Sequence, residues 1–190
     1  LNAEAATIAL TAGISAGVGV VKATTSSRSE ITIRDGVTIG GTSKADVDRI
    51  EITASRGDKL NGETFNLSLG LAAAGAVVVD AENIGTAAVK IGQSSSAVPP
   101  SATTATVLNA GTIVVSASDN TSTTTEGVGS TGGVIALNSV VVSGLNNGIV
   151  RTHLDNARLL GSNVSVNAVS AARASATAEG VEPRDFSERT

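Results

Sequence analysis

The segment Thr112-Ile113-Val114-Val115-Ser116-Ala117 decides the fold, because two similar segments occur elsewhere in the chain. They are Ile50-Glu51-Ile52-Thr53-Ala54, which lies before it, and Asn163-Val164-Ser165-Val166-Asn167-Ala168, which lies after it. The final alanines of successive copies are 63 and 51 residues apart. In each copy apolar β-branched residues alternate, or nearly alternate, with polar ones, which predicts a short β-strand with one buried face.

The segments around these strands also recur. A stretch rich in glycine and alanine follows the first two copies, at residues 69–79 and 132–142, and residues 12–21 look like the same stretch from an earlier copy. A repeat of roughly 50 to 60 residues, built of short strands and small residues, predicts a β-solenoid whose turns bury their inward faces on one another. With about 20 residues in a turn, each repeat would supply two or three turns, and the chain would form a rod on the order of 40 Å long.

The chain is therefore predicted to be a single solenoid segment with divergent repeats at about residues 1–54, 55–117 and 118–168. Residues 93–104 include Pro99 and Pro100, which cannot donate hydrogen bonds to a sheet, so they are predicted to form a loop inserted in one repeat. The alanine-rich residues 168–179 are interpreted as a strand. The charged tail, residues 180–190, breaks the pattern and is expected to act as a cap or as a strap at an interface.

The composition excludes several kinds of site and partner. The chain has 190 residues, a net charge of −4, no cysteine, one histidine and two aromatic residues. It therefore lacks the side chains for a disulfide scaffold, a zinc site or a cysteine nucleophile, and we expect no metal and no cofactor. Without stacking aromatic residues or a basic surface, it is not expected to bind nucleic acid. No apolar run reaches the roughly 18 residues needed to span a bilayer, so membrane insertion is not expected.

One tripeptide is a candidate adhesion site. Arg56-Gly57-Asp58 follows a predicted strand. An arginine and an acid displayed on a tight glycine turn can engage a carboxylate and a cation of a receptor together. The alternative interpretation is an ordinary surface turn, because glycine and aspartate are common turn residues.

Other clusters have plainer interpretations. His153 and Asp155 share a strand face, as a hydrolase pair would, and Ser143 and Ser162 are nearby, but no nucleophile motif accompanies them. Acidic and amide side chains near turns could offer oxygen ligands to calcium, although their spacing matches no calcium loop. These residues are Asp46, Asp48, Asp80, Glu82, Asp119 and Asn120. The hydroxyl-rich residues 121–125 suit a surface loop. We expect no catalytic residues and no enzymatic activity.

Three further segments point to a family. They are Gly111 to Ala117, Gly132 to Val142, and Asn156 to Ala168 with the alanine- and serine-rich residues after it. In these segments the chain resembles one repeat of the large filamentous adhesins of bacterial type V secretion. The resemblance is closest to the leukotoxin-type adhesin repeats and looser to filamentous haemagglutinins, and residues 50–111 look like a second, more divergent copy. The resemblance implies a right-handed parallel β-helix in an extracellular or cell-surface protein, without catalysis.

Together these observations predict a non-catalytic structural and adhesive segment. It would be a stiff rod that carries loops, such as residues 93–104 and 118–130, to a host surface or a neighbouring cell. The alternative is a subunit of a self-assembling extracellular filament, because an open solenoid end exposes unpaired strand groups that stacking or strand donation would satisfy. In both cases the partners are proteins, reached through surface contacts or self-association.

Overall fold

The structure is a computed structural model that describes residues 1–93 and 105–181. Within those residues it consists of β-strands and short turns, with no helix, so no helix there is long and apolar enough to cross a membrane. The strands are β1 (Asn2–Leu10), β2 (Ile14–Arg34), β3 (Thr38–Gly40), β4 (Arg49–Arg56), β5 (Lys59–Leu69), β6 (Ala72–Gln93), β7 (Thr106–Asn109), β8 (Thr112–Asp119), β9 (Ser122–Gly132), β10 (Ile135–Leu154), β11 (Ala157–Leu160), β12 (Asn163–Ser170) and β13 (Arg173–Val181).

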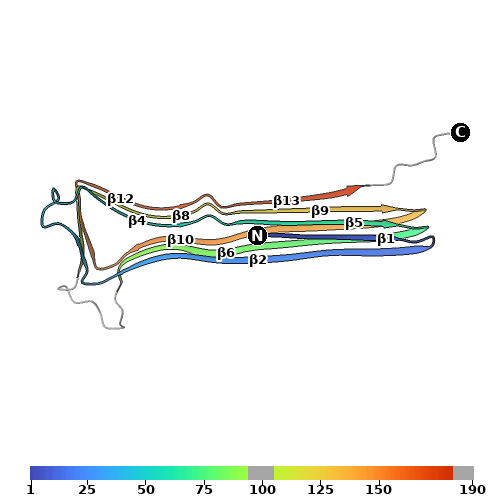
Figure 1. The fold of residues 1–190 in the computed structure, drawn as a ribbon, viewed down its shortest axis with the longest axis horizontal. Coiled ribbons are helices and arrows are strands. Elements are labelled where there is room, and N and C mark those ends of the chain that lie inside the picture. Colours follow the sequence, from blue (N-terminus) through green and yellow to red (C-terminus); the bar gives the residue numbers. More distant parts are fainter. Residues whose placement is uncertain (94–104, 182–190) are drawn as a thin grey trace.

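Every strand pairs in parallel with the strand one repeat away, so the chain is an all-β parallel solenoid. Sheet A has the order β1-β5-β9-β13, sheet B the order β10-β6-β2, sheet C the order β11-β7-β3, and sheet D the order β12-β8-β4. One coil runs through sheets B, C, D and A in turn. Sheet B forms one long side of the coil, and sheets D and A form the opposite side end to end (Figure 1).

The repeat recognised in the sequence is one complete coil. Ala54 pairs with Ala117, and Ala117 pairs with Ala168, so the similar segments are stacked neighbours in sheet D. The expectation of about 20 residues in a turn was therefore wrong. A strand of 20 residues such as β10 extends about 65 Å, whereas three stacked strands occupy on the order of 10–15 Å. The expected 40 Å rod along the stack was wrong too, because the long dimension lies along the strands.

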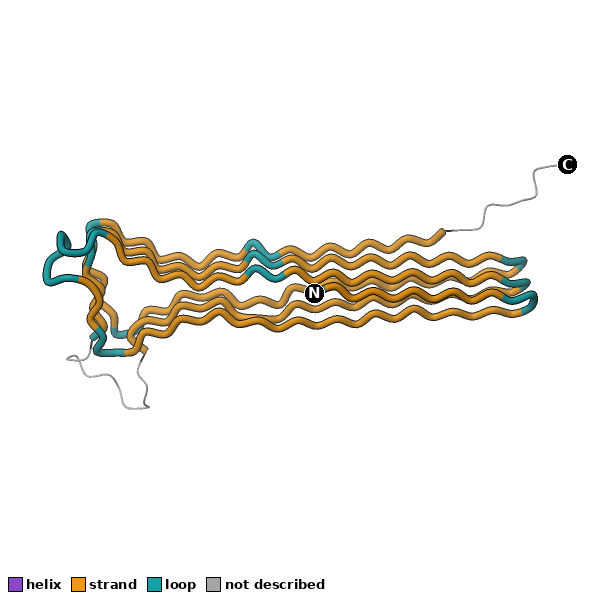
Figure 2. The backbone as a smooth tube through the Cα atoms, in the orientation of Figure 1, coloured by secondary structure: helices purple, strands orange, loops and turns teal. Residues whose placement is uncertain are grey.

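Two insertions explain why the coils differ in length. Between sheets B and C the second coil has residues 94–105, where the first and third coils have residues 35–37 and 155–156. The predicted proline loop falls there, although residues 94–104 themselves lie outside the described part of the chain. Between sheets C and D the first coil has residues 41–48, where the others have two residues. The strands that flank both insertions meet at the end closed by sheet C, which we call the wide end (Figure 2).

The hydrophobic core fills the wide end. Inward-facing side chains stack in ladders across the coils, for example Ile50, Ile113 and Val164, or Ile52, Val115 and Val166. The middle coil is the best covered, and Leu108, Ile113 and Val115 are fully buried. Aliphatic side chains from sheets B, C and D meet here in the largest apolar cluster, whereas two smaller clusters lie between sheets A and B, so the wide end supplies most of the hydrophobic stabilisation.

At the opposite end, where β1, β5 and β9 turn into β2, β6 and β10, the two layers approach too closely for large inward side chains. We call this the narrow end. A Cβ added to Gly127 would lie 2.8 Å from Cγ2 of Val142, and one added to Gly17 would lie 2.7 Å from Oδ1 of Asn66. Polar side chains fill the remaining space, and Asn66 donates from Nδ2 to the carbonyl oxygens of Gly17 and Ala76 at 2.7 and 3.1 Å.

Candidate interaction surfaces

The candidate adhesion tripeptide folds inward at its arginine. Arg56 lies at the end of β4 and occupies the same alternate, inward-facing positions as Ile52 and Ala54. It is 5% exposed. Its Nε donates to Oδ2 of Asp58 at 2.9 Å, and Nη1 lies 3.5 Å from Oδ2 of Asp119. Nη2 donates to Oδ1 of Asn83. The arginine is therefore buried and is not displayed on the surface together with Asp58. This geometry gives no support to receptor binding by the tripeptide.

The arginine belongs to a buried polar network that joins two coils. Gly85 and Gly148 in sheet B make room for it: a Cβ on Gly85 would lie 2.7 Å from Nη1 of Arg56, and one on Gly148 would lie 2.3 Å from Oδ2 of Asp119. The hydroxyl of Ser27 donates to Asp58, and this bond, together with the arginine, lowers the pKa of the Asp58 carboxyl below its usual value. The network therefore stabilises the junction between sheets D and A by joining side chains of neighbouring coils.

The structure does not assemble a hydrolase triad. His153 lies outward on β10, and Asp155 follows in the turn. Ser143 lies on the same strand ten residues earlier, which is on the order of 30 Å away. Ser162 lies in the turn between β11 and β12. These residues do not converge.

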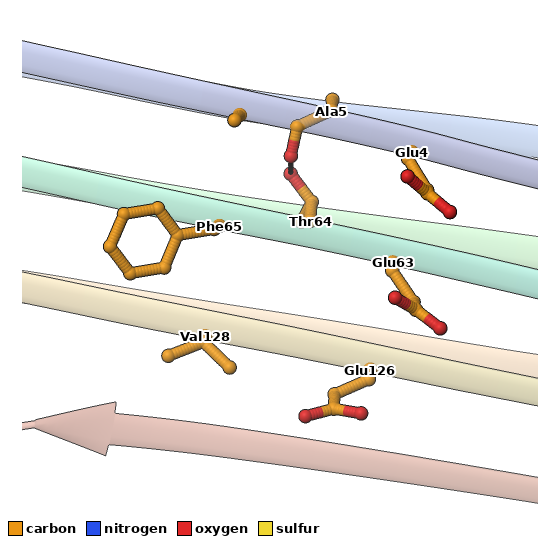
Figure 3. Close-up of a pocket in the computed structure, with 8 residues that line it drawn as sticks. Glu4, Ala5, Glu63, Thr64, Phe65, Glu126 and Val128 are labelled. Carbon is orange, nitrogen blue, oxygen red and sulfur yellow. Dashed lines mark hydrogen bonds between the residues drawn. The ribbon is translucent and has the colours of Figure 1, made fainter.

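Three glutamates form a ladder on the outer face of sheet A. The register places Glu4, Glu63 and Glu126 side by side, beside Phe65 and Val128, around a shallow hollow (Figure 3). The ladder was not singled out from the sequence, although the repeat spacing would have aligned Glu63 with Glu126. In the described residues no group of three or more acidic, histidine or cysteine side chains is arranged to hold a metal ion.

Replacing Glu63 by glutamine is expected to stabilise the chain. Like charges directly opposite on neighbouring strands destabilise a sheet, and Glu63 has one on each side, so the free energy of unfolding should rise by about 0.5 kcal/mol. Urea unfolding at low salt measures the change, which should shrink at high salt because screening weakens the repulsion. The control is Glu51→Gln, because Glu51 pairs with Arg49 at 2.9 Å and should not become more stable when neutralised. Equal stabilisation of both variants would contradict a ladder effect.

The hydroxyl-rich segment enters a strand whose alternate residues face inward, so its prediction as a surface loop was wrong. Residues 118–130 comprise the end of β8, a two-residue turn and most of β9. Thr121, Thr123 and Thr125 face inward and are at most 1% exposed. Thr125 donates to the carbonyl of Ser175, and Thr123 donates to Oδ1 of Asn146 at 2.8 Å. These threonines fill the interior beside the junction between sheets D and A and are not displayed.

A different loop is displayed at the wide end. Residues 41–48 leave the first coil between β3 and β4. The backbone N–H of Ser43 donates to Oδ2 of Asp46 at 2.7 Å, and the hydroxyl of Thr42 donates to the same oxygen at 3.0 Å. These bonds lower the pKa of the Asp46 carboxyl, with the Ser43 N–H making the largest contribution. The cluster of threonine, serine, lysine and aspartate between two strands was the sequence signal for this loop.

The two ends of the stack are covered unequally. In the first coil Ile50 and Ile52 are 8% and 9% exposed, and Val47 from the 41–48 loop packs against the core cluster that contains them. In the last coil the equivalent Val164 and Val166 are 46% and 41% exposed. We call the face formed by β10, β11, β12 and β13 the open end. It combines unpaired backbone groups with uncovered core residues.

Comparison with known protein families, curated proteins and solved structures found no match for this chain. The resemblance to adhesin repeats therefore stays a prediction. What the chain does must follow from its own surfaces, of which the open end, the displayed loop and the outer faces of the long sheets are the principal ones.

Proposed function

We propose that the chain is a non-catalytic structural segment of a longer solenoid, in an extracellular or cell-surface filamentous protein of the adhesin type that it resembles. The observation that carries this proposal is the open end. The ladders of inward-facing side chains end there at Val164 and Val166, which are nearly half exposed. The backbone of the last coil keeps the regular parallel register that a further coil would need. A further coil placed on β10 to β13 would bury these side chains and pair the free strand edges.

The loops at the wide end would make the adhesive contacts with a partner. The strands that flank both insertions meet there, and the 41–48 loop is held in a defined shape by Asp46. The long sheets carry few turns elsewhere, so a partner that approaches the wide end meets the most variable part of the coil. Loops that carry binding residues on a rigid scaffold are a common arrangement in binding proteins.

In the described residues the strand count fits a further coil on β10 to β13 better than a second copy of this segment stacked end to end. Sheet A has four strands, whereas sheets B, C and D have three. Suppose that a second copy placed its β1 beside β13 of the first copy. Its β2 would then lie two strand spacings from β10, so the two strands could not pair. A gap of one strand would then remain in sheets B, C and D. A chain that continues past β13 enters sheet B at the missing level, which is where the uncovered β10 lies.

The mass and shape of the native polypeptide test the proposal. Intact-mass measurement of the protein from its source, with electron microscopy of the same material, should give a mass well above 18.6 kDa and particles longer along the stack than three coils. A polypeptide of 18.6 kDa in end-to-end fibres would overturn the proposal in favour of the filament subunit. A polypeptide of that mass that stays monomeric would overturn both.

A further inference from the structure

The narrow end is built with polar residues inside and apolar residues outside. Inward positions on β5 and β9 hold Thr64, Asn66, Ser68 and Thr131, all at most 5% exposed. On the same part of sheet B the outward positions are apolar on all three strands except at Ser139 on β10, and we call the apolar ones the apolar face. They are Ile14, Ala16, Val18 and Val20 on β2, Ala72, Ala74, Ala76 and Val78 on β6, and Ile135, Leu137 and Val141 on β10.

The apolar face is grooved along the strands. The central strand, β6, contributes Ala72, Ala74 and Ala76 as a floor. The flanking strands contribute larger side chains as walls: Ile14, Val18 and Val20 are 82%, 61% and 58% exposed, and Ile135, Leu137 and Val141 are 63%, 67% and 53% exposed. The walls stand on strands about 10 Å apart, since each strand spacing is about 4.8 Å.

The exposed area is large for a surface without a partner. At these exposed fractions the six wall side chains alone present on the order of 600 Å² of accessible surface, and the floor adds to it, so the area approaches the roughly 800 Å² that each partner buries in a standard interface. The continuous apolar stretch ends at the next outward position, where Lys22 pairs with Asp80 at 3.7 Å, and beyond it apolar residues such as Leu145 and Ile149 alternate with polar ones. From there toward the wide end the same face carries charged residues, including Arg28, Glu30 and Lys90.

Two features of the sheet indicate what covers this face. First, β2 and β10 are edge strands of sheet B, so their free N–H and C=O groups lie beside the apolar side chains. Hydrocarbon cannot pair such groups, and an open edge inside a lipid layer is strongly unfavourable. Second, the face is complementary to itself, because a wall of large aliphatic side chains fits a floor of alanines one strand spacing away.

We propose that the apolar face binds the apolar face of a second copy of this chain, so that two solenoids pack side by side through sheet B at the narrow end. Each copy places one wall in the alanine groove of the other, at the usual spacing of about 10 Å between packed sheets. The edge of β2, and that of β10 where no further coil covers it, stays in water at the side of the interface. Sheet A is less suited, because its outer face at this end includes Thr177 and Glu179 on β13.

The test is the association state of the chain and of two charge variants. Sedimentation equilibrium of the unmodified chain should show a reversible dimer of twice 18.6 kDa. Ala74→Glu introduces a charge into the groove floor, at an exposed outward position, and should weaken dimerisation at least 100-fold. Ser26→Glu introduces the same charge on the polar half of the same sheet and should leave the dimer intact. Circular dichroism and urea unfolding check that both variants remain folded.

A second measurement does not depend on the charge variants. Because the chain has no cysteine, a single cysteine at Ala74 can be joined to its counterpart with a bismaleimide of about 10 Å, the spacing of packed sheets. It should cross-link efficiently, and a cysteine at Ser26 should not. A chain that is monomeric in every one of these measurements would overturn the proposal. Flotation of that monomer with neutral phosphatidylcholine vesicles would not rescue it, because it would assign the apolar face to lipid. So would a dimer that Ala74→Glu leaves unchanged, since that dimer would use another surface such as the open end.

Discussion

Replacing Arg56 by leucine is expected to lower the free energy of unfolding by about 3–5 kcal/mol, because the change leaves the carboxylate of Asp119 buried without its partner. The side chains of Arg56 and Asp119 are 2% and 1% exposed, so water cannot replace the lost interaction. Asn83 and Asp58 lose a donor at the same time. Equilibrium unfolding in urea, followed by circular dichroism, measures the loss.

Two further variants separate the buried network from a general effect of removing an arginine. Arg49→Leu lies on the same strand, but its pair with Glu51 is about half exposed, so it should cost at most about 1 kcal/mol. The double variant Arg56→Leu with Asp119→Leu should recover part of the loss, since two apolar side chains can replace a buried ion pair. Similar losses for Arg49→Leu and Arg56→Leu would show that the Arg56 network is not buried as described.

Val115→Ala is expected to destabilise the chain by about 2–3 kcal/mol, from two buried methyl groups and the cavity they leave. Val115 is fully buried at the centre of the ladder formed with Ile52 and Val166. Urea unfolding again gives the change. The effect reports directly on whether the middle coil is sandwiched between two others.

The matched control is Val166→Ala, one coil further along the same ladder. Val166 is 41% exposed at the open end, so the same truncation should cost about 1 kcal/mol or less. The difference between the two variants follows from their positions in the stack, because the residue type and the strand position are identical. Equal costs would contradict an uncovered last coil.

Much of the fold could be predicted from the repeat. The similar segments that end at Ala54, Ala117 and Ala168 are paired strands, and the proline-containing insertion falls between two strands of the second coil only. Most of the alanine-rich residues 168–179 are also β-structure, although they belong to two strands, β12 and β13, with residues 171–172 between them. Repetition indicates pairing because copies of one segment occupy equivalent places in successive coils.

The length of a coil could not be predicted from local patterns. Alternation with a period of two residues marks a strand, whatever the number of strands in a turn. The length of a coil is set by which segments pair with one another. The spacing of 63 and 51 residues between the similar segments already gave this length, and the assumption of about 20 residues in a turn was not needed. The tail at 180–190 also begins later than expected, since Gly180 and Val181 still belong to β13, and residues 182–190 lie outside the described part.

Strand parity held more information about the candidate site than its tripeptide motif did. Arg56 falls on the same alternate positions as Ile50, Ile52 and Ala54, and Asp119 occupies the same place in the next copy. Together these facts indicate a buried ion pair between coils. The narrow end is different, because there polar and small residues lie inward and large apolar residues of sheet B lie outward, so the alternation alone cannot say which face lies inward.

The central claim is that one repeat forms one coil, with Thr53 of the first coil beside Ser116 of the second. The most direct test uses two spin labels on cysteines at these outward positions, which lie on neighbouring strands about 4.8 Å apart. Continuous-wave electron paramagnetic resonance should then show strong dipolar and exchange broadening. A pair at Thr53 and Thr112, four residues out of register, should show much less. Broadening that is absent from the first pair, or equal in both, would contradict the coil described here.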